Sequence, residues 1–167
     1  MKMTNAYDYI KESLRANLRN KLIEFRKQNS VTRIDKPSDI GRARKLGYKD
    51  KKGFIIVRVR IKRGGHKRPR PNKGRKVRNL TINKSLAMNY RWIAEMRAAK
   101  KYPSLEILNS YKVAKDGKSY WYEVILIDPK IKEIKNDPTI NWICSNKNRK
   151  RAHRGLTSAA KKSRGLR

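Results

Sequence analysis

The chain has 167 residues, with 46 Lys and Arg against 13 Asp and Glu, so its formal net charge is +33. Solubility needs far less charge than this, and a compact body with so much like charge repels itself unless a polyanion neutralises it, which makes nucleic acid the expected partner. A content of 37% apolar residues excludes a purely disordered basic tail, and the single cysteine, Cys144, excludes an intramolecular disulfide and a cysteine-based zinc cluster.

Two helices are predicted within residues 1–50. The first spans residues 4–27, where apolar side chains recur every three or four residues. The second lies in "SDIGRARKLGY", with Ser38 or Asp39 as the expected N-cap and Gly47 as the residue that ends it. Basic side chains lie on both helices: Lys11, Arg15 and Arg19 form a ridge on the first, and Arg42, Arg44 and Lys45 lie together on the second.

A strand is predicted next, in "FIIVRVRIKR", residues 54–63. Its apolar residues alternate with residues that include two arginines, so successive side chains point to opposite faces of a sheet. One face is expected to pack in a core, and the other is expected to carry Arg58, Arg60 and Lys62 outward.

The segment that follows, residues 63–79, is predicted to be an extension without its own fold. Its sequence, "RGGHKRPRPNKGRKVRN", has no hydrophobic period, and its prolines and glycines disfavour both helix and sheet. Contacts with phosphates would order it, because they release condensed counterions, and Gly64 and Gly65 would let the backbone approach a ribose or phosphate closely. The alternative is a flexible linker with a solvated charge run.

Charge is divided unevenly along the chain. Residues 51–94 hold 15 basic residues and no acid, and residues 138–167 hold 9 basic residues and no acid. Residues 95–137 are nearly balanced, with 9 basic and 7 acidic residues. This pattern is typical of a folded body with basic extensions that bind nucleic acid.

The balanced segment contains a predicted helix over residues 85–101, with Ser85 as N-cap, and a predicted β-hairpin. In the hairpin, Asp116-Gly117 is expected to form the two-residue loop. This register places Val113 opposite Tyr120 and Tyr111 opposite Tyr122.

Together these elements predict an α+β fold, a small antiparallel sheet packed with helices and carrying long basic extensions. The expected division is residues 1–62 for the first helices and strand, 63–79 for the basic extension, 80–144 for the helix and hairpin, and 145–167 for a basic C-terminal extension.

Aromatic side chains can pack in a core or stack on unpaired bases. Aliphatic neighbours favour the core for Tyr90, Trp92, Tyr111, Tyr122 and Trp142. Tyr48 and Trp121 remain candidates for base contacts, because Tyr48 follows a basic helix and Trp121 shares a polar strand face with Lys112 and Glu123.

Enzymatic chemistry is not indicated. The sequence has no phosphate-binding glycine loop, and His66 and His153 have no acidic neighbour to orient them. A lone Cys144 is more typical of packing than of a nucleophile. We therefore expect no catalytic residues, no metal and no cofactor.

Three stretches carry a family resemblance: "RARKLGYKDKKGFIIVRVRIKRGGHKRPRPNKGR", "ILNSYKVAKDGKSYWYEVILIDP" and "RGLTSAAKKSRGLR". They resemble large-subunit ribosomal protein fifteen of the archaeal and eukaryotic type (L-fifteen-e). The resemblance implies a structural, non-catalytic role in which basic extensions bind and stabilise large-subunit ribosomal RNA and support ribosome assembly and translation. Family members continue with a further basic stretch beyond the position of Arg167, so contacts of that stretch are not carried over.

The basic segments and the family motifs RARxLGY, RVRxxRGG and RGLTSAxxKSRG together define the expected contacts with ribosomal RNA. These are Lys11, Arg15, Arg19, Arg42, Arg44, Lys45, Tyr48, Arg58, Arg60, Lys62, Arg63, Gly64, Gly65, His66, Lys67, Arg68, Arg70, Lys73, Arg75, Lys76, Arg78, Arg149, Lys150, Arg151, Arg154, Lys161, Lys162 and Arg164.

The expected partners are large-subunit ribosomal RNA and neighbouring ribosomal proteins, in the ribosome and in the cytoplasm. No membrane is expected, since no run approaches 18 apolar residues. No small-molecule substrate and no second copy of the chain is expected either. The alternative is a general protein that compacts DNA or RNA outside the ribosome. Charge alone fits this alternative equally well, but the sequence lacks the dimer signal or recognition helix expected of a duplex reader.

Overall fold

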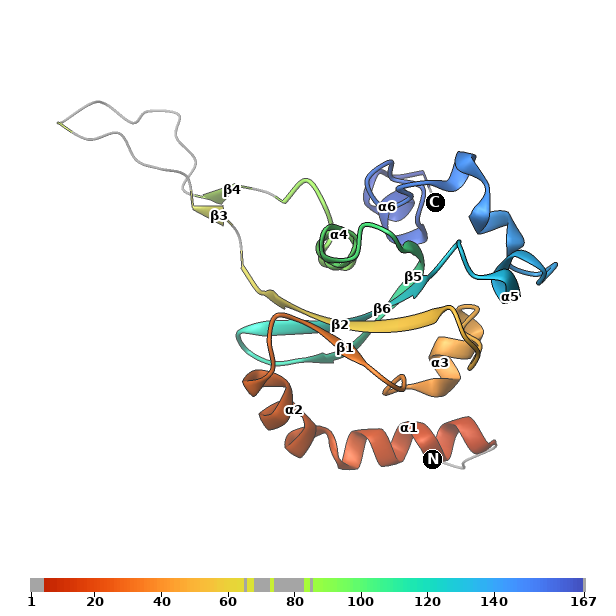
Figure 1. The fold of residues 1–167 in the computed structure, drawn as a ribbon. Helices are drawn as coiled ribbons and strands as arrows, with labels where there is room; N and C mark the ends of the chain where they lie inside the picture. The colour runs from red at the N-terminus through yellow and green to blue at the C-terminus, as the bar shows by residue number, and fades with distance from the viewer. Residues whose placement is uncertain (1–4, 65, 68–72, 74–82, 85, 167) are drawn as a thin grey trace.

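A computed structural model of the chain describes residues 5–64, 66–67, 73, 83–84 and 86–166. Its centre is a four-stranded antiparallel sheet in the order β1-β2-β6-β5 (Figure 1). The strands are β1 (Val31–Ile34), β2 (Phe54–Lys62), β5 (Glu106–Lys115) and β6 (Ser119–Ile127), and a short antiparallel pair, β3 (His66–Lys67) and β4 (Asn83–Lys84), lies beyond the end of β2.

Helices cover both faces of this sheet, so the predicted α+β class is confirmed. In Figure 1, α4 crosses one face and the C-terminal segment lies beyond it, while α1, α2 and α3 lie on the other face. The bounds are α1 (Ala6–Ala16), α2 (Leu18–Lys27), α3 (Ile40–Lys45), α4 (Tyr90–Lys101), α5 (Lys132–Lys135) and α6 (Ser158–Ser163), with two 3₁₀ helices, η1 (Asn141–Cys144) and η2 (Asn146–Asn148).

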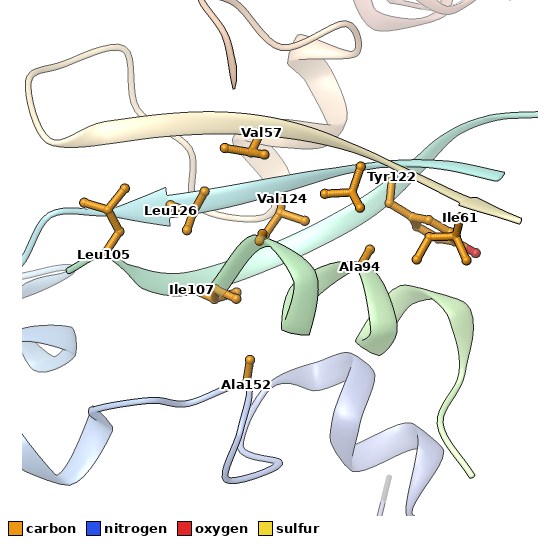
Figure 2. Close-up of a cluster of buried hydrophobic side chains, with 11 residues drawn as sticks. Val57, Ile61, Ala94, Leu105, Ile107, Tyr122, Val124, Leu126 and Ala152 are labelled. Atoms are coloured by element: carbon orange, nitrogen blue, oxygen red, sulfur yellow. The ribbon is translucent and has the colours of Figure 1, made fainter. Parts of the chain in front are cut away.

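The main core lies between the sheet and α4 (Figure 2). Alternating residues of β2 and β6 point to this face, among them Val57 and Val124, which are directly paired across the two strands. Ala94 and Ala98, one turn apart on α4, are fully buried against them, and their small side chains let the helix lie close to the sheet. Each fully buried aliphatic side chain here stabilises the fold by about 1.5–3 kcal/mol.

The other face of the sheet mixes apolar and charged groups. Ile56, Ile125 and Tyr111 pack there against Ala43 of α3 and the buried Tyr48. Arg58 of β2 and Glu123 of β6 are directly paired on the same face, beneath α2 and the loop before α3. The prediction that this face of β2 points outward is therefore wrong at Arg58, which is only 8% exposed.

Two predicted helices differ from the structure in their bounds. The helix over residues 4–27 is two helices that break at Asn17, whose side-chain amide and main-chain amide both donate to the Ser13 carbonyl. Asparagine is disfavoured inside helices because its side chain can bond to the nearby main chain. The helix predicted from Ser85 begins at Tyr90 instead, since the Asn89 side chain caps it by accepting from the Trp92 amide at 2.8 Å. Ser85 itself lies outside the described residues.

The hairpin register is also different from the prediction. Gly117 and Lys118 form the loop, because the Asp116 carboxylate accepts from the Lys118 and Ser119 amides and the Asp116 amide donates to the Ser119 carbonyl. A bulge in β5 between Lys112 and Ala114 then shifts the pairing, so Tyr111 lies opposite Glu123 rather than Tyr122.

Residues 145–166 fold onto α4 rather than leaving the body. The Trp92 indole nitrogen donates to the Ala152 carbonyl at 2.8 Å, and the Asn89 side-chain amide donates to the Ala159 carbonyl at 2.8 Å. Ala159 and Ala160 are buried. These small side chains let the basic segment pack closely on the body.

Glu95 links α4 to two other elements from a fully buried position. Its carboxylate accepts hydrogen bonds of 2.5 Å from the hydroxyl groups of Ser110 on β5 and Thr157 in the C-terminal segment. Burial raises the pKa of the Glu95 carboxyl above its ordinary value of 4.5, although these hydrogen bonds and the charges of Arg91 and Arg151 oppose the shift.

This raised pKa predicts a specific dependence of stability on pH. The folded protein holds the Glu95 proton to a higher pH than the unfolded chain does, so this group's contribution to stability is lost as pH rises from about 4.5 through the folded pKa. Glu95→Gln removes the titration. We expect the stability of the wild type, measured by urea unfolding at several pH values, to fall relative to this variant as pH rises. Parallel curves for the two proteins would contradict the prediction.

Candidate nucleic-acid interface

The first basic surface lies where β2 leaves the sheet beside the β5–β6 turn. We call it the hairpin surface and define it by four exposed residues, Lys62, Arg63, Lys112 and Lys118. The Arg63 amide donates to the Lys118 carbonyl at 2.9 Å, and the Arg63 guanidinium lies 5.1 Å from the centre of the Tyr120 ring. Lys112 lies over the same ring. Lys112 and Lys118 were not among the predicted contacts, because they reach Lys62 and Arg63 only through the pairing of β6 with both β2 and β5.

The extension begins from a fixed point next to this surface. The Tyr90 hydroxyl, at the start of α4, accepts from the Gly64 amide at 3.0 Å and donates to the Gly64 carbonyl at 3.3 Å. Gly64 has a φ of +106°, which glycine adopts at little cost. Gly64 is therefore tied to the first residue of α4.

The second basic surface is the α3 surface, defined by Arg42, Arg44 and Lys45, all exposed. Asp39 caps this helix as predicted, since its carboxylate accepts from the Arg42 amide at 2.9 Å. Gly47, at a φ of +95°, follows the end of the helix. The buried Ala43 fixes the inner side of the helix, so the three cations point away from the sheet.

The third basic surface is the C-terminal surface. It is defined by the exposed residues Arg149, Lys150, Arg154, Lys161, Lys162 and Arg164. The backbone that carries them is held in place, because the Lys150 amide donates to the Glu106 carboxylate at 2.9 Å and Arg154 donates to the Lys147 carbonyl at 2.6 Å. These cations are presented by a folded segment rather than by a tail.

Arg151 lies in the same segment but has a different environment. Its guanidinium donates to the carbonyl groups of Ile107 at 2.6 Å and Leu108 at 3.2 Å on β5. Burial lowers the pKa of this guanidinium, while the charges of Glu95 and Glu106 oppose the shift. Arg151 thus holds the C-terminal segment to β5. The N–H donors that do so are not free to bond a phosphate.

Three residues considered for contacts with RNA point into the protein. The Arg58 guanidinium lies 3.8 Å from the centre of the Phe25 ring and bonds to Glu123, Ser38 and Gln28. Tyr48 is 6% exposed and Trp121 is 1% exposed, because α2 and α3 cover this face of the sheet. Their polar neighbours in the sequence had suggested that these side chains are exposed and contact RNA.

The remaining predicted contacts are divided between exposed and undescribed positions. Arg19 and Lys73 are exposed, and Arg60 is partly exposed and donates to the Arg26 carbonyl at 2.8 Å. Lys11 and Arg15 lie in α1, and His66 and Lys67 lie in β3, with side chains outside the described part of the structure. Gly65, Arg68, Arg70, Arg75, Lys76 and Arg78 lie outside the described residues.

Several carboxylates are buried or already paired with other groups of the protein. Glu95 and Glu123 are fully buried, and Glu106 is 9% exposed. Asp137 lies between the Lys49 and Lys51 ammonium groups, at 2.7 and 2.5 Å, and these hydrogen bonds hold the pKa of its carboxyl well below its usual range.

The three surfaces lie on separate elements. In Figure 1, α3 lies on one side of the sheet, α6 and the C-terminal segment lie beyond α4 on the other side, and the end of β2 lies beside the β5–β6 turn at one end of the sheet. Such an arrangement suits a polyanion that encloses the protein better than one that fills a single groove. Within the described residues, no group of three or more His, Cys, Asp or Glu could hold a metal ion, and no helix is long and apolar enough to cross a membrane.

Comparison with protein families adds an independent finding. The family model described as Ribosomal L15 matches residues 3–167. The match includes all three basic surfaces and the segment between β3 and β4, so it covers nearly the whole chain rather than one motif.

Proposed function

The chain belongs to the Ribosomal L15 family of the archaeal and eukaryotic type, and from this premise we propose that its three basic surfaces are the contacts with large-subunit ribosomal RNA. Family membership makes the protein a structural constituent of the large ribosomal subunit, a kind of protein that binds ribosomal RNA and acts in translation without catalysis. The match over residues 3–167 is the observation that carries this conclusion.

The proposed mechanism is mutual stabilisation of protein and RNA. Each exposed Lys or Arg that meets a phosphate releases condensed counterions, and this gain offsets the entropy lost when RNA and protein segments become ordered. The Glu95 and Tyr90 contacts fix the positions from which the C-terminal surface and the extension reach the RNA. Neighbouring ribosomal proteins are further proposed partners, and the cytoplasm is the proposed location of the assembled particle. We also propose that this chain itself catalyses no reaction.

Gradient sedimentation of a cell lysate tests the ribosomal assignment against general compaction of nucleic acid. In low magnesium, where the two subunits separate, the protein is expected to sediment with the large subunit and to stay there in high salt. Ribonuclease should release it, and deoxyribonuclease should not. A protein that remains at the top of the gradient, or that follows chromosomal DNA, would contradict the proposal.

A further inference from the structure

Trp142 is a large aromatic side chain that the core does not use. It was predicted to pack inside, but it is 41% exposed, whereas its neighbour Ile143 is 1% exposed. Trp is enriched at interfaces, because its ring offers a large rigid apolar surface with one polar edge. We propose that Trp142 is a stacking platform for one unpaired base of RNA. This inference rests on the proposed function and adds a base contact to its phosphate contacts.

The backbone at Trp142 is held in one conformation. Ile143 packs with Ile134 and Ile140 in a buried cluster below η1. The Trp142 carbonyl accepts from the Asn148 side-chain amide at 2.6 Å and from the Ser145 amide at 3.4 Å. A base that stacks on this ring therefore meets a surface that is already ordered, so binding loses little further conformational entropy.

The indole ring is also supported from one side. The Arg151 guanidinium lies over the ring, 4.7 Å from its centre. Arg151 is itself fixed by its bonds to the Ile107 and Leu108 carbonyl groups, so this planar cation cannot easily leave the ring. The indole is thus paired with a cation, and 41% of the residue remains exposed. Arginine–indole pairs of this kind combine stacking with cation–π attraction.

The surroundings favour a nucleotide over a protein side chain as the second planar group. Trp142 lies in residues 138–167, which contain no acidic residue, and the exposed Lys147, Arg149 and Lys150 follow it within eight positions. A stacked nucleotide brings phosphates on both sides of its base, and these cations can neutralise them. An apolar pocket on a protein would accept the indole but would leave the same cations without a counter-charge.

Binding of the full chain to an in vitro transcript of large-subunit rRNA, measured over a series of salt concentrations, tests the platform. Trp142→Ala is expected to weaken binding by about 5- to 150-fold, the range for loss of one base–aromatic stack, with the salt dependence unchanged because no phosphate contact is lost. Trp142→Phe should keep most of the affinity. Arg149→Gln is the matched contrast, since it should reduce the slope of log K against log salt by about 0.7–0.9.

The outcomes distinguish failure of the Trp142 platform from failure of the proposed rRNA contacts. If Trp142→Ala binds within twofold of the wild type while Arg149→Gln still changes the salt slope, the platform is wrong and the rRNA contacts stand. If the wild type does not bind the transcript, both fail. Ultraviolet cross-linking of intact large subunits gives a second readout, in which a conjugate of Trp142 with a nucleotide supports the platform and a conjugate with another protein overturns it. The stability of Trp142→Ala, measured by urea unfolding, shows whether this variant folds like the wild type. If it does not, Trp142→Phe decides, and a loss of affinity greater than fivefold in Trp142→Phe counts against the platform.

Discussion

Replacing Glu123 by glutamine is expected to lower the free energy of unfolding by about 3–5 kcal/mol, the usual cost of removing one partner of a buried ion pair. Glu123 is fully buried, and its carboxylate accepts from five donors. These are Arg58 Nε at 3.3 Å and Nη2 at 3.1 Å, the Ser38 amide at 3.0 Å, the Ser38 hydroxyl at 2.6 Å and the Tyr111 hydroxyl at 2.5 Å.

Glutamine fits the same volume but cannot replace these interactions. One of its terminal atoms is a donor, and it would face donors that now bond to a carboxylate oxygen. Burial and the Glu123 charge raise the pKa of the Tyr111 phenol well above its usual range, so this hydroxyl stays protonated and donates. Arg58, at 8% exposure, would keep its charge without a carboxylate beside it.

Urea unfolding of the free protein, followed by circular dichroism, measures the effect. Glu133→Gln on α5 is the matched control, because Glu133 is exposed, and a surface change of this kind is expected to alter stability by no more than about 0.5 kcal/mol. A loss below 1 kcal/mol for Glu123→Gln would contradict the prediction.

The same pair shows how far the sequence could predict the fold. Alternation in residues 54–62 correctly separates Val57 and Val59 from Ile56 and Arg58, because side chains alternate with a period of two whatever covers the sheet. Which face is exposed depends on α2 and α3, and no local pattern in β2 contains that information. One available signal was Glu123, an isolated acid on an apolar strand that pairs with the strand carrying Arg58.

The candidate interface divides in the same way. The helix α3 was predicted correctly in its end, Gly47, and its cap is Asp39, one of the two predicted candidates, since short-range rules decide both. The prediction of the hairpin surface was incomplete, because Lys112 and Lys118 reach it through pairing between distant segments. The C-terminal segment was expected to be an extension, since its charge is obvious, whereas the contacts of Ala152, Ala159 and Thr157 depend on the shape of α4 and β5.

Removing charge from the C-terminal surface is expected to have the largest effect on RNA binding. Changing Arg149, Lys150, Lys161 and Lys162 together to glutamine should lower the slope of log K against log salt by about 3, because each phosphate contact contributes about 0.7–0.9. Affinity for large-subunit rRNA at 150 mM salt should fall on the order of 10²-fold. All four side chains are exposed, and the described hydrogen bonds of these residues use only main-chain atoms, so the fold should persist.

The control variant removes the same number of charges elsewhere. Lys52, Lys130, Lys132 and Lys135 are exposed near α5, in a region that also contains Asp128, Glu133 and Asp137. Changing these four lysines to glutamine should reduce the slope by less than 1, because nearby carboxylates already compensate part of their charge. Filter binding with both variants and the wild type distinguishes local phosphate contacts from total charge. Equal losses for the two variants would mean that net charge alone drives binding and that the C-terminal surface has no special role.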